Sequence, residues 1–212
     1  MHRIVIIMVF VSLTVTGAVG AAAQDASPAA EFDIPAPADC TVEPRTEEGF
    51  RALFEEASSA ATPSASPVPG ILPAGEPVDD QTKGDINTVW RHFTACVNAG
   101  DLARAFALSS DQQLRREFVY PDIDTAAEDQ LIEIFMAPPV PLDPSFAVPF
   151  FPLEEARLLD DGRVAAVAPG ESGQGQVVIF IKEGDRWLID DQSDLIQEST
   201  PEAAAPPISF AL

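Results

Sequence analysis

Residues 89–118, VWRHFTACVNAGDLARAFALSSDQQLRREF, decide the fold. Their first part continues an apolar pattern with the helical spacing i, i+3, i+4, i+7 and i+11, which predicts one apolar stripe on a helix of about four turns. The residues of this stripe are Ile86, Val89, Trp90, Phe93 and Val97. Gly100 suits a left-handed C-cap, and Asp101 can cap the next helix, so the sequence predicts a helix, a tight turn and a second helix.

Three shorter helices are expected after this turn. Leu102–Leu108 carries apolar residues at i, i+3 and i+4, and Asp111 is expected to cap a helix over 112–118. Pro121 interrupts the chain, and Thr125–Met136 forms the last helix. Its inward residues are expected to be Ala127, Leu131, Ile134 and Phe135.

The C-terminal half has the composition of strands and turns. Six prolines exclude a regular element over residues 137–152, so we expect an apolar loop that packs Phe146, Phe150 and Phe151 on the body. Two hairpins follow. Their strands are expected at Glu155–Leu159, Arg163–Ala168, Gln176–Lys182 and Arg186–Asp191. Helices followed by a four-stranded antiparallel sheet predict an α+β fold.

Residues 89–118, followed by QVVIFIKEGDRWLIDD at 176–191, resemble the nuclear transport factor 2-like superfamily, which includes SnoaL-like proteins and ketosteroid isomerase. The matching parts are the helix–NAGD–helix opening and the last hairpin with GDRWLID. The resemblance covers roughly residues 83–193. It implies a cone in which a curved antiparallel sheet of about four strands wraps the helices and leaves an apolar pocket at its open end. Because the family contains isomerases, dehydratases, cyclases and non-catalytic domains, it indicates a fold more than a function.

The family fold implies an aromatic lining for that pocket. The candidates are Trp90, Phe93, Tyr120, Phe180 and Trp187. Simple core packing is the plainer interpretation for all of them except Tyr120. Tyr120 is the single tyrosine and directly precedes Pro121, so its phenol could reach a cavity or pack, exposed, on the proline.

Enzymes of this superfamily place a carboxylate in the pocket, often with a tyrosine, histidine or arginine partner. The available acids are Asp122, Asp124, Glu133 and Asp190. Asp190 alternates with Leu188 and could point inward, although a solvated strand end is the alternative. His92 lies about 100° from Phe93 around the helix, which indicates a boundary position rather than a general base. Tyr120, Asp190 and His92 are therefore only weak catalytic candidates.

Two functional hypotheses remain open. The first is a non-catalytic secreted domain that binds a small apolar ligand or a protein partner. The second is a SnoaL-like isomerase, cyclase or dehydratase that pairs a pocket carboxylate with Tyr120 or His92. A signal peptide predicted at residues 1–23 and the lack of a convincing acid–base pair favour the first. No cofactor motif is found, and the cysteine spacing matches no zinc motif. Asp160-Asp161-Gly162 is typical of a turn, and calcium binding is a distant second interpretation. We expect no cofactor or metal, and a monomer or homodimer.

The upstream segments differ in composition from this domain, which we expect at residues 79–198 with a flexible tail at 199–212. A disordered leader is predicted at 24–39 and a Pro/Ala/Ser linker at 59–78. Between them, residues 40–58 form a short helical island. Thr46 can cap its helix, whose apolar residues are Phe50, Leu53 and Phe54.

Residues 1–23 read as a signal peptide cleaved after Ala23. A charged start precedes the uncharged run Ile4–Val19, and Ala21 and Ala23 provide the small residues of a cleavage site. The run contains Ser, Thr and Gly and is short for a membrane span. No cysteine lies near the site, so no lipid anchor is expected. In an exported protein the two cysteines, Cys40 and Cys96, predict a disulfide.

The charge of the chain limits its partners. The sequence has 34 acidic against 12 basic residues, a net charge of −22. Removal of residues 1–23 takes away one basic residue, Arg3, and leaves the remainder more acidic still. Such a surface repels phosphate backbones, so nucleic acid and anionic membranes are poor partners, and we expect no nucleic-acid partner and no stable membrane anchor.

Overall fold

A computed structural model describes residues 33–57, 70–119, 124–170 and 175–195. The expected signal peptide, the expected tail from residue 199 and Tyr120 lie outside these ranges. Within them, helices pack with a single antiparallel sheet, which confirms the α+β class. The same residues contain no helix that is long and apolar enough to cross a membrane.

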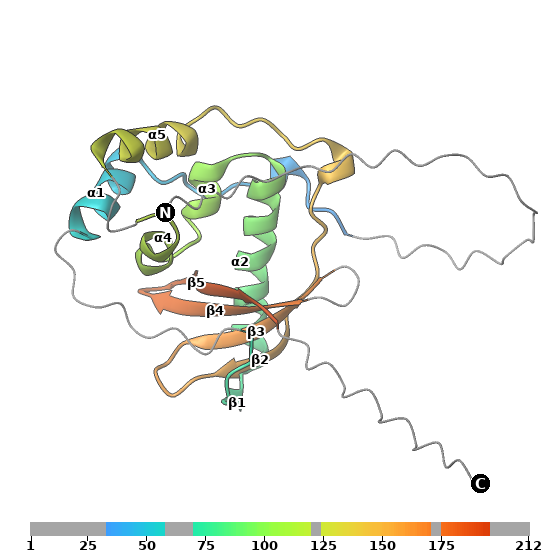
Figure 1. Ribbon diagram of the computed structural model, residues 1–212. Coiled ribbons are helices and arrows are strands. Elements are labelled where there is room, and N and C mark those ends of the chain that lie inside the picture. Colours follow the sequence, from blue (N-terminus) through green and yellow to red (C-terminus); the bar gives the residue numbers. More distant parts are fainter. Residues whose placement is uncertain (1–32, 58–69, 120–123, 171–174, 196–212) are drawn as a thin grey trace, which may run out of the picture. The chain divides into compact units, whose positions relative to one another are not determined.

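In the described residues the sheet has five strands in the order β1-β2-β3-β4-β5, with antiparallel neighbours throughout (Figure 1). They are β1 (Glu76–Pro77), β2 (Glu154–Leu158), β3 (Val164–Pro169), β4 (Gly175–Glu183) and β5 (Arg186–Asp194). The expected count of about four is one too low, because β1 comes from the proline-rich segment before the first long helix. Proline is tolerated there because β1 is an edge strand.

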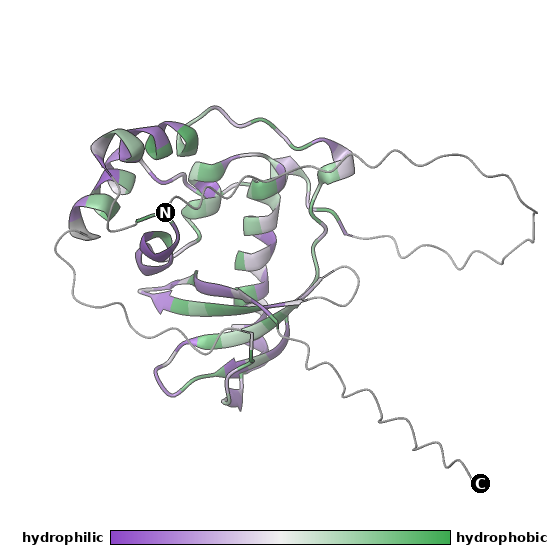
Figure 2. Ribbon diagram, in the orientation of Figure 1, coloured by the Kyte–Doolittle hydropathy of each residue, from purple (hydrophilic) through white to green (hydrophobic). Residues whose placement is uncertain are grey.

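Helix α2 (Asp80–Asn98) crosses one face of the sheet (Figure 1). Its Ile86 is fully buried among Val164, Val178, Phe180 and Ile189 of the strands. The opposite face also has buried residues, Ala165, Val177 and Ile179, packed with Leu72, Leu159 and Leu195. β4 is therefore apolar on both faces and central, as its sequence predicts, and Figure 2 shows it as mostly hydrophobic.

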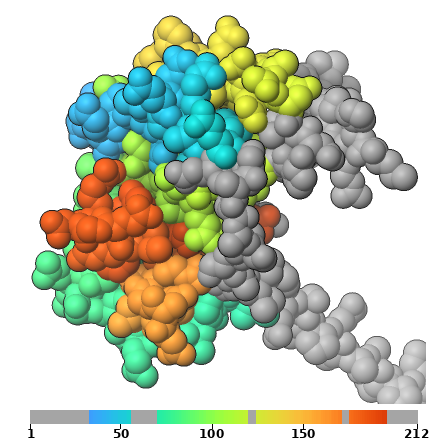
Figure 3. Space-filling model, turned by 90° about the vertical axis from the view of Figure 1, so that its left-hand side faces the viewer, coloured from blue at the N-terminus to red at the C-terminus, as the bar shows by residue number. Residues whose placement is uncertain are grey.

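A second core joins the remaining helices. These are α1 (Glu47–Ala57), α3 (Leu102–Phe106), α4 (Asp111–Phe118) and α5 (Thr125–Phe135). The Phe135 ring centroid lies 4.9 Å from those of Phe106 and Phe118, and 5.1 Å from that of Phe50. The helix of the 40–58 island thus shares a core with the body, and Figure 3 shows α1 and α5 side by side.

Two details of the helices differ from the expectation. Ser110, not Asp111, caps α4: its Oγ accepts a hydrogen bond from the Gln113 amide at 3.0 Å. On α5, Ile132 and Phe135 are buried, whereas Ile134 is 49% exposed and is not an inward residue. Ile134 lies two residues, about 200°, from Ile132, so burying Ile132 turns Ile134 outward.

The predicted disulfide is confirmed. Cys40 and Cys96 are bonded, with their Cα atoms 4.7 Å apart. The predicted turn after α2 is also confirmed, since Gly100 has φ +65° and the Asp101 carboxylate accepts from the Arg104 amide at 3.1 Å. A Cβ at Gly100 would lie 2.1 Å from the Val140 carbonyl oxygen, so glycine lets residues 137–152, called the proline-rich loop from here on, cross the end of α2.

Candidate functional site

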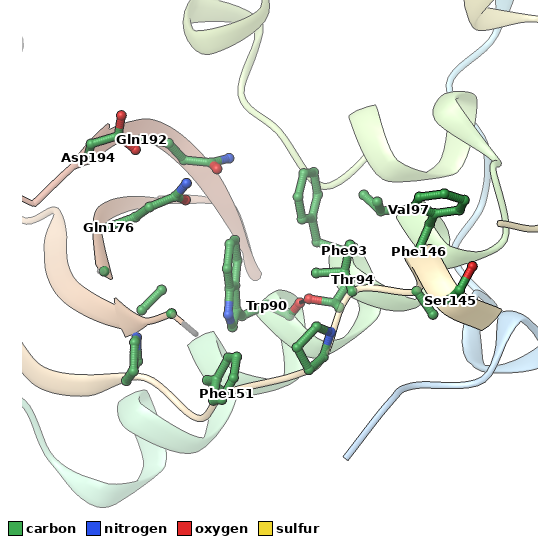
Figure 4. A pocket seen from close by; sticks show the side chains of 17 residues that line it. Trp90, Phe93, Thr94, Val97, Ser145, Phe146, Phe151, Gln176, Gln192 and Asp194 are labelled. Atoms are coloured by element: carbon green, nitrogen blue, oxygen red, sulfur yellow. Dashed lines mark hydrogen bonds between the residues drawn. The ribbon is translucent and has the colours of Figure 1, made fainter. Parts of the chain in front are cut away.

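A cavity of about 700 Å³ opens between α2, the proline-rich loop and the ends of β3, β4 and β5 (Figure 4). From α2 it is lined by Trp90, Phe93, Thr94 and Val97, and from the loop by residues 145–149 and Phe151. From the sheet it is lined by Ala168, Pro169, Gly170, Gly175, Gln176, Gln192 and Asp194. Three segments distant in sequence therefore share this site.

Aromatic rings form one side of the cavity. Trp90 and Phe93, one helical turn apart, stack with their ring centroids 5.6 Å apart and an angle of 11° between the planes. From the proline-rich loop, Phe146 and Phe151 add two more rings. Phe146 is 71% exposed, so the expectation that it packs on the body is wrong. The short 3-10 turn at Pro144–Phe146 leaves this ring at the edge of the cavity instead.

The sheet supplies the polar side of the cavity. Gln176 pairs with Asp194, and Val178 pairs with Gln192. Because side chains alternate along a strand, Gln176 shares the face of Val178 and Phe180, which is the face that packs on α2. This face is apolar around Phe180 and becomes polar towards Gln176 and Asp194. In Figure 4 the side chains of Gln176 and Gln192 project from the strands towards the side of Trp90 and Phe93.

A β-bulge in β5 brings two of these polar side chains to the cavity. Phe180 pairs with Ile189, but Ile179 pairs with Asp191, so Asp190 is one extra residue opposite β4. The bulge shifts the alternation by one. Without the bulge, Gln192 and Asp194 would lie on the opposite face from Ile189. With it, Gln192 and Asp194 lie on the same face as Ile189, which is the face of the cavity. Simple alternation in the sequence could have indicated Gln176, but it assigns Gln192 and Asp194 to the wrong face.

Two asparagines of α2 position the proline-rich loop along the helix. Asn98 is buried, its Nδ2 donates to the Val148 carbonyl at 3.0 Å, and its Oδ1 accepts from the Val148 amide at 2.7 Å. Asn87, eleven residues earlier and thus about three turns away, accepts at 2.8 Å from the amide of Leu153, the residue that directly follows the loop. The sequence indicates Asn98 only as part of a helix end, yet this side chain positions a wall of the cavity.

The segment just before the disulfide supports the same loop from outside. The Phe150 amide donates to the Asp33 carbonyl at 2.7 Å, and Asn98 Nδ2 also donates to the Pro35 carbonyl at 3.1 Å. The Arg91 guanidinium donates to the Asp33 carboxylate, and this hydrogen bond lowers the pKa of Asp33. The same guanidinium lies 5.2 Å from the centroid of the Phe150 ring. Residues 33–35, within the expected leader, are thus in contact with the loop.

Asp190, a predicted catalytic candidate, does not line the cavity. Its side chain is 1% exposed, and its carboxylate accepts from Ser110 Oγ at 2.6 Å and from Arg163 at 3.0 Å. Arg163 also bonds Asp161 at 2.8 Å, and this hydrogen bond lowers the pKa of Asp161. Before the bulge, Asp190 lies on the same face of β5 as Leu188. Leu188 pairs with Ile181, which lies on the face of the sheet away from α2, so Asp190 is also on that face. The contacts are those of a structural carboxylate.

The structure brings together only part of the predicted lining. Trp90 and Phe93 reach the cavity, whereas Phe180 is fully buried in the core beneath it. Trp187 lines a separate hollow of about 420 Å³ with residues such as Val89, Leu108 and Asp185. His92 is partly buried on α2 and is not a lining residue of either hollow. Tyr120 lies outside the described residues.

The lining has little chemistry for catalysis. Among its described residues, Asp194 is the single ionisable side chain, accompanied by two amides and two hydroxyls. The Thr94 hydroxyl is engaged with the Trp90 carbonyl at 3.0 Å. In the described part of the chain no three His, Cys, Asp or Glu side chains gather in a metal-binding group. The arrangement suits the binding of an apolar molecule with one polar end.

Comparison with known proteins gives no relative: no protein-family model, no curated protein and no solved structure matches this chain.

Proposed function

We propose that this protein is an exported, non-catalytic domain of the nuclear transport factor 2-like type that binds a small apolar ligand in the cavity between α2 and the sheet. The packing of α2 on one face of an antiparallel sheet supports the fold proposal. The signal-like residues 1–23 and the Cys40–Cys96 disulfide support export.

The observation that carries the binding proposal is Phe146, a 71% exposed ring at the edge of a ligand-sized cavity. Ligand cavities in proteins commonly measure about 300–1,000 Å³ and are mostly apolar, with a few polar groups that orient the ligand. Here four aromatic rings face three polar side chains across such a volume. A bound apolar molecule would remove the exposed face of Phe146 from water, which is favourable.

The enzyme hypothesis has weaker support. A SnoaL-like reaction would need a buried carboxylate and a second acid–base group in the cavity. Asp194 is the described carboxylate of the lining, but it is exposed at the rim. Asp190 is engaged with Ser110 and Arg163, and His92 is not in the lining. Tyr120 as a partner for Asp194 is what this alternative would require.

A protein partner is the second candidate, favoured by exposed apolar side chains around the C-terminal end of α5 and on the proline-rich loop. They are Ile134, Met136, Val140 and Leu142. Large apolar side chains that are exposed close together in the sequence can belong to an interaction site. Val140 does not line the cavity, so substitutions at Val140 and Phe146 separate the two candidates.

The test compares Phe146→Ala with Val140→Ala, a matched change on the same loop at a residue that is 74% exposed. Binding of biphenylmethanol, an apolar probe, is measured by calorimetry. We expect Phe146→Ala to weaken binding about tenfold, because part of a phenyl contact is lost, and Val140→Ala to leave it unchanged. Both variants should keep the wild-type unfolding temperature. Absence of probe binding, or equal loss in both variants, would contradict the proposal.

A further inference from the structure

We propose that the cavity selects apolar aromatic ligands that carry a positive charge, with Asp194 as the group that recognises the charge. This inference rests on the proposed binding function and adds the chemical class of the ligand. It follows from three features of the described residues: the charge of the lining, the placement of its aromatic rings and the charge of the whole chain.

The ionisable charge in the described lining of the cavity is negative. Asp194 is its single described ionisable residue, and no described residue forms an ion pair with it. Several other aspartates are engaged, as Asp33 is with Arg91, Asp101 with Arg104, and Asp190 with Arg163. The Asp194 carboxylate is therefore left available to a ligand. An anionic ligand would meet this carboxylate with no described cation in the lining to compensate.

The aromatic rings favour the same ligand class. The stacked pair Trp90 and Phe93 lies on α2, and the polar row Gln176, Gln192 and Asp194 lies on the strands across from it. In Figure 4 the Trp90 ring extends from α2 towards Gln176. A flat molecule could lie on the rings and direct a donor group to the amide and carboxylate oxygens. Indole is also the best aromatic partner for a cation.

The charge of the chain adds a long-range contribution. A net charge of −22 raises the local concentration of cations around the protein and lowers that of anions. This effect acts at every acidic surface and does not by itself define a site. The experiment therefore has to separate the general field from the contribution of Asp194.

Three probes that share a biphenyl group and differ in charge provide the test. At neutral pH biphenylmethylamine is cationic, biphenylmethanol is neutral and biphenylcarboxylate is anionic. The chain has two tryptophans, so Trp187→Phe leaves Trp90 as the single tryptophan reporter. Calorimetry on the unsubstituted protein gives a second measurement that does not depend on this variant. Asp194→Asn removes the charge at the cavity. Asp160→Asn removes the same charge from the exposed turn at the other end of β3.

We expect the amine to bind about three- to tenfold more tightly than the alcohol, and the carboxylate to bind most weakly. Asp194→Asn should abolish the preference for the amine and leave the affinity for the alcohol unchanged, whereas Asp160→Asn should keep the preference. Equal affinities for amine and alcohol, or a preference that survives Asp194→Asn, would overturn this inference alone. Failure of all three probes to bind would overturn the proposed function and this inference together.

Discussion

At the scale of single residues, Asp190, the extra residue in β5, has structural contacts, whereas the polar residues that follow it line the cavity. Asp190 occupies the bulge and is held by Ser110 and Arg163, while Gln192 and Asp194, beyond the bulge, turn to the cavity. The buried carboxylate joins the N-terminal cap of α4 to the sheet. The exposed carboxylate of Asp194, four residues later in β5, is the one that a ligand can contact.

Asp190→Ala should therefore destabilise the protein without affecting the cavity. We expect the free energy of unfolding to fall by about 2–3 kcal/mol, because Ser110 loses a buried acceptor while Arg163 keeps Asp161. Urea unfolding measures this loss, and the Asp160→Asn variant is the control for a change in net charge. In a double-mutant cycle with Ser110→Ala the effects should be non-additive. A large change in biphenylmethanol affinity would show instead that Asp190 acts on the site.

At the scale of elements, α2 organises the site. One side of it packs Ile86 into the sheet, Trp90 and Phe93 line the cavity, and Asn87 and Asn98 position the proline-rich loop. Its start is fixed by Asp79, whose carboxylate accepts from the Thr82 amide at 2.6 Å. This backbone hydrogen bond is the main cause that lowers the pKa of Asp79 below 3.8.

The cap predicts a pH dependence of stability. A lowered folded-state pKa means that the contribution of Asp79 is present above the unfolded-state value and is lost as the pH falls through the folded-state value, below 3.8. Asp79→Ala should lower the unfolding temperature at pH 7, and this difference should shrink in acid. Asp79→Ser keeps a capping oxygen without a titratable charge, so its effect relative to Asp79→Ala should not vary with pH. An Asp79→Ala effect of constant size down to pH 2.5 would contradict the role of the carboxylate.

At the scale of the whole described unit, the disulfide connects segments that belong to two of its apolar cores. One core lies between α2 and the sheet, and the other lies among α1, α3, α4 and α5. The Cys40–Cys96 bond links the segment before α1 to the buried part of α2 across 56 positions of sequence. Phe50 and its aromatic neighbours hold α1 independently of the bond.

Replacement of both cysteines by serine should therefore weaken the protein without unfolding it. Chain-entropy arithmetic for a loop of this length gives a loss of at most about 4 kcal/mol in the free energy of unfolding. Urea unfolding of the double variant and of the wild type, with and without reductant, measures the loss, and reductant should affect only the wild type. Thiol titration of the unfolded, unreduced wild type should detect no free thiol. Two thiols per chain would contradict the disulfide.

Local patterns in the sequence were sufficient for the elements near residues 86–101 and for the hairpins. The stripe from Ile86 to Val97, the turn at Gly100 and the caps at Thr46 and Asp101 depend on neighbours within one or two helical turns. The Cys40–Cys96 bond was predicted because the chain has two cysteines and its first residues resemble an export signal. Half of the aromatic side of the cavity, Trp90 and Phe93, was also predicted.

Tertiary structure alone decided the rest. Edge strand β1 exists because β2 offers it a partner, and α1 joins the body because its phenylalanines meet those of α3, α4 and α5. The side chains of Gln192 and Asp194 face the cavity because β5 bulges against β4 at Asp190. A period of two along a strand sets which residues share a face only while the pairing register is unbroken, and the register is a property of two strands, which neither strand's sequence contains.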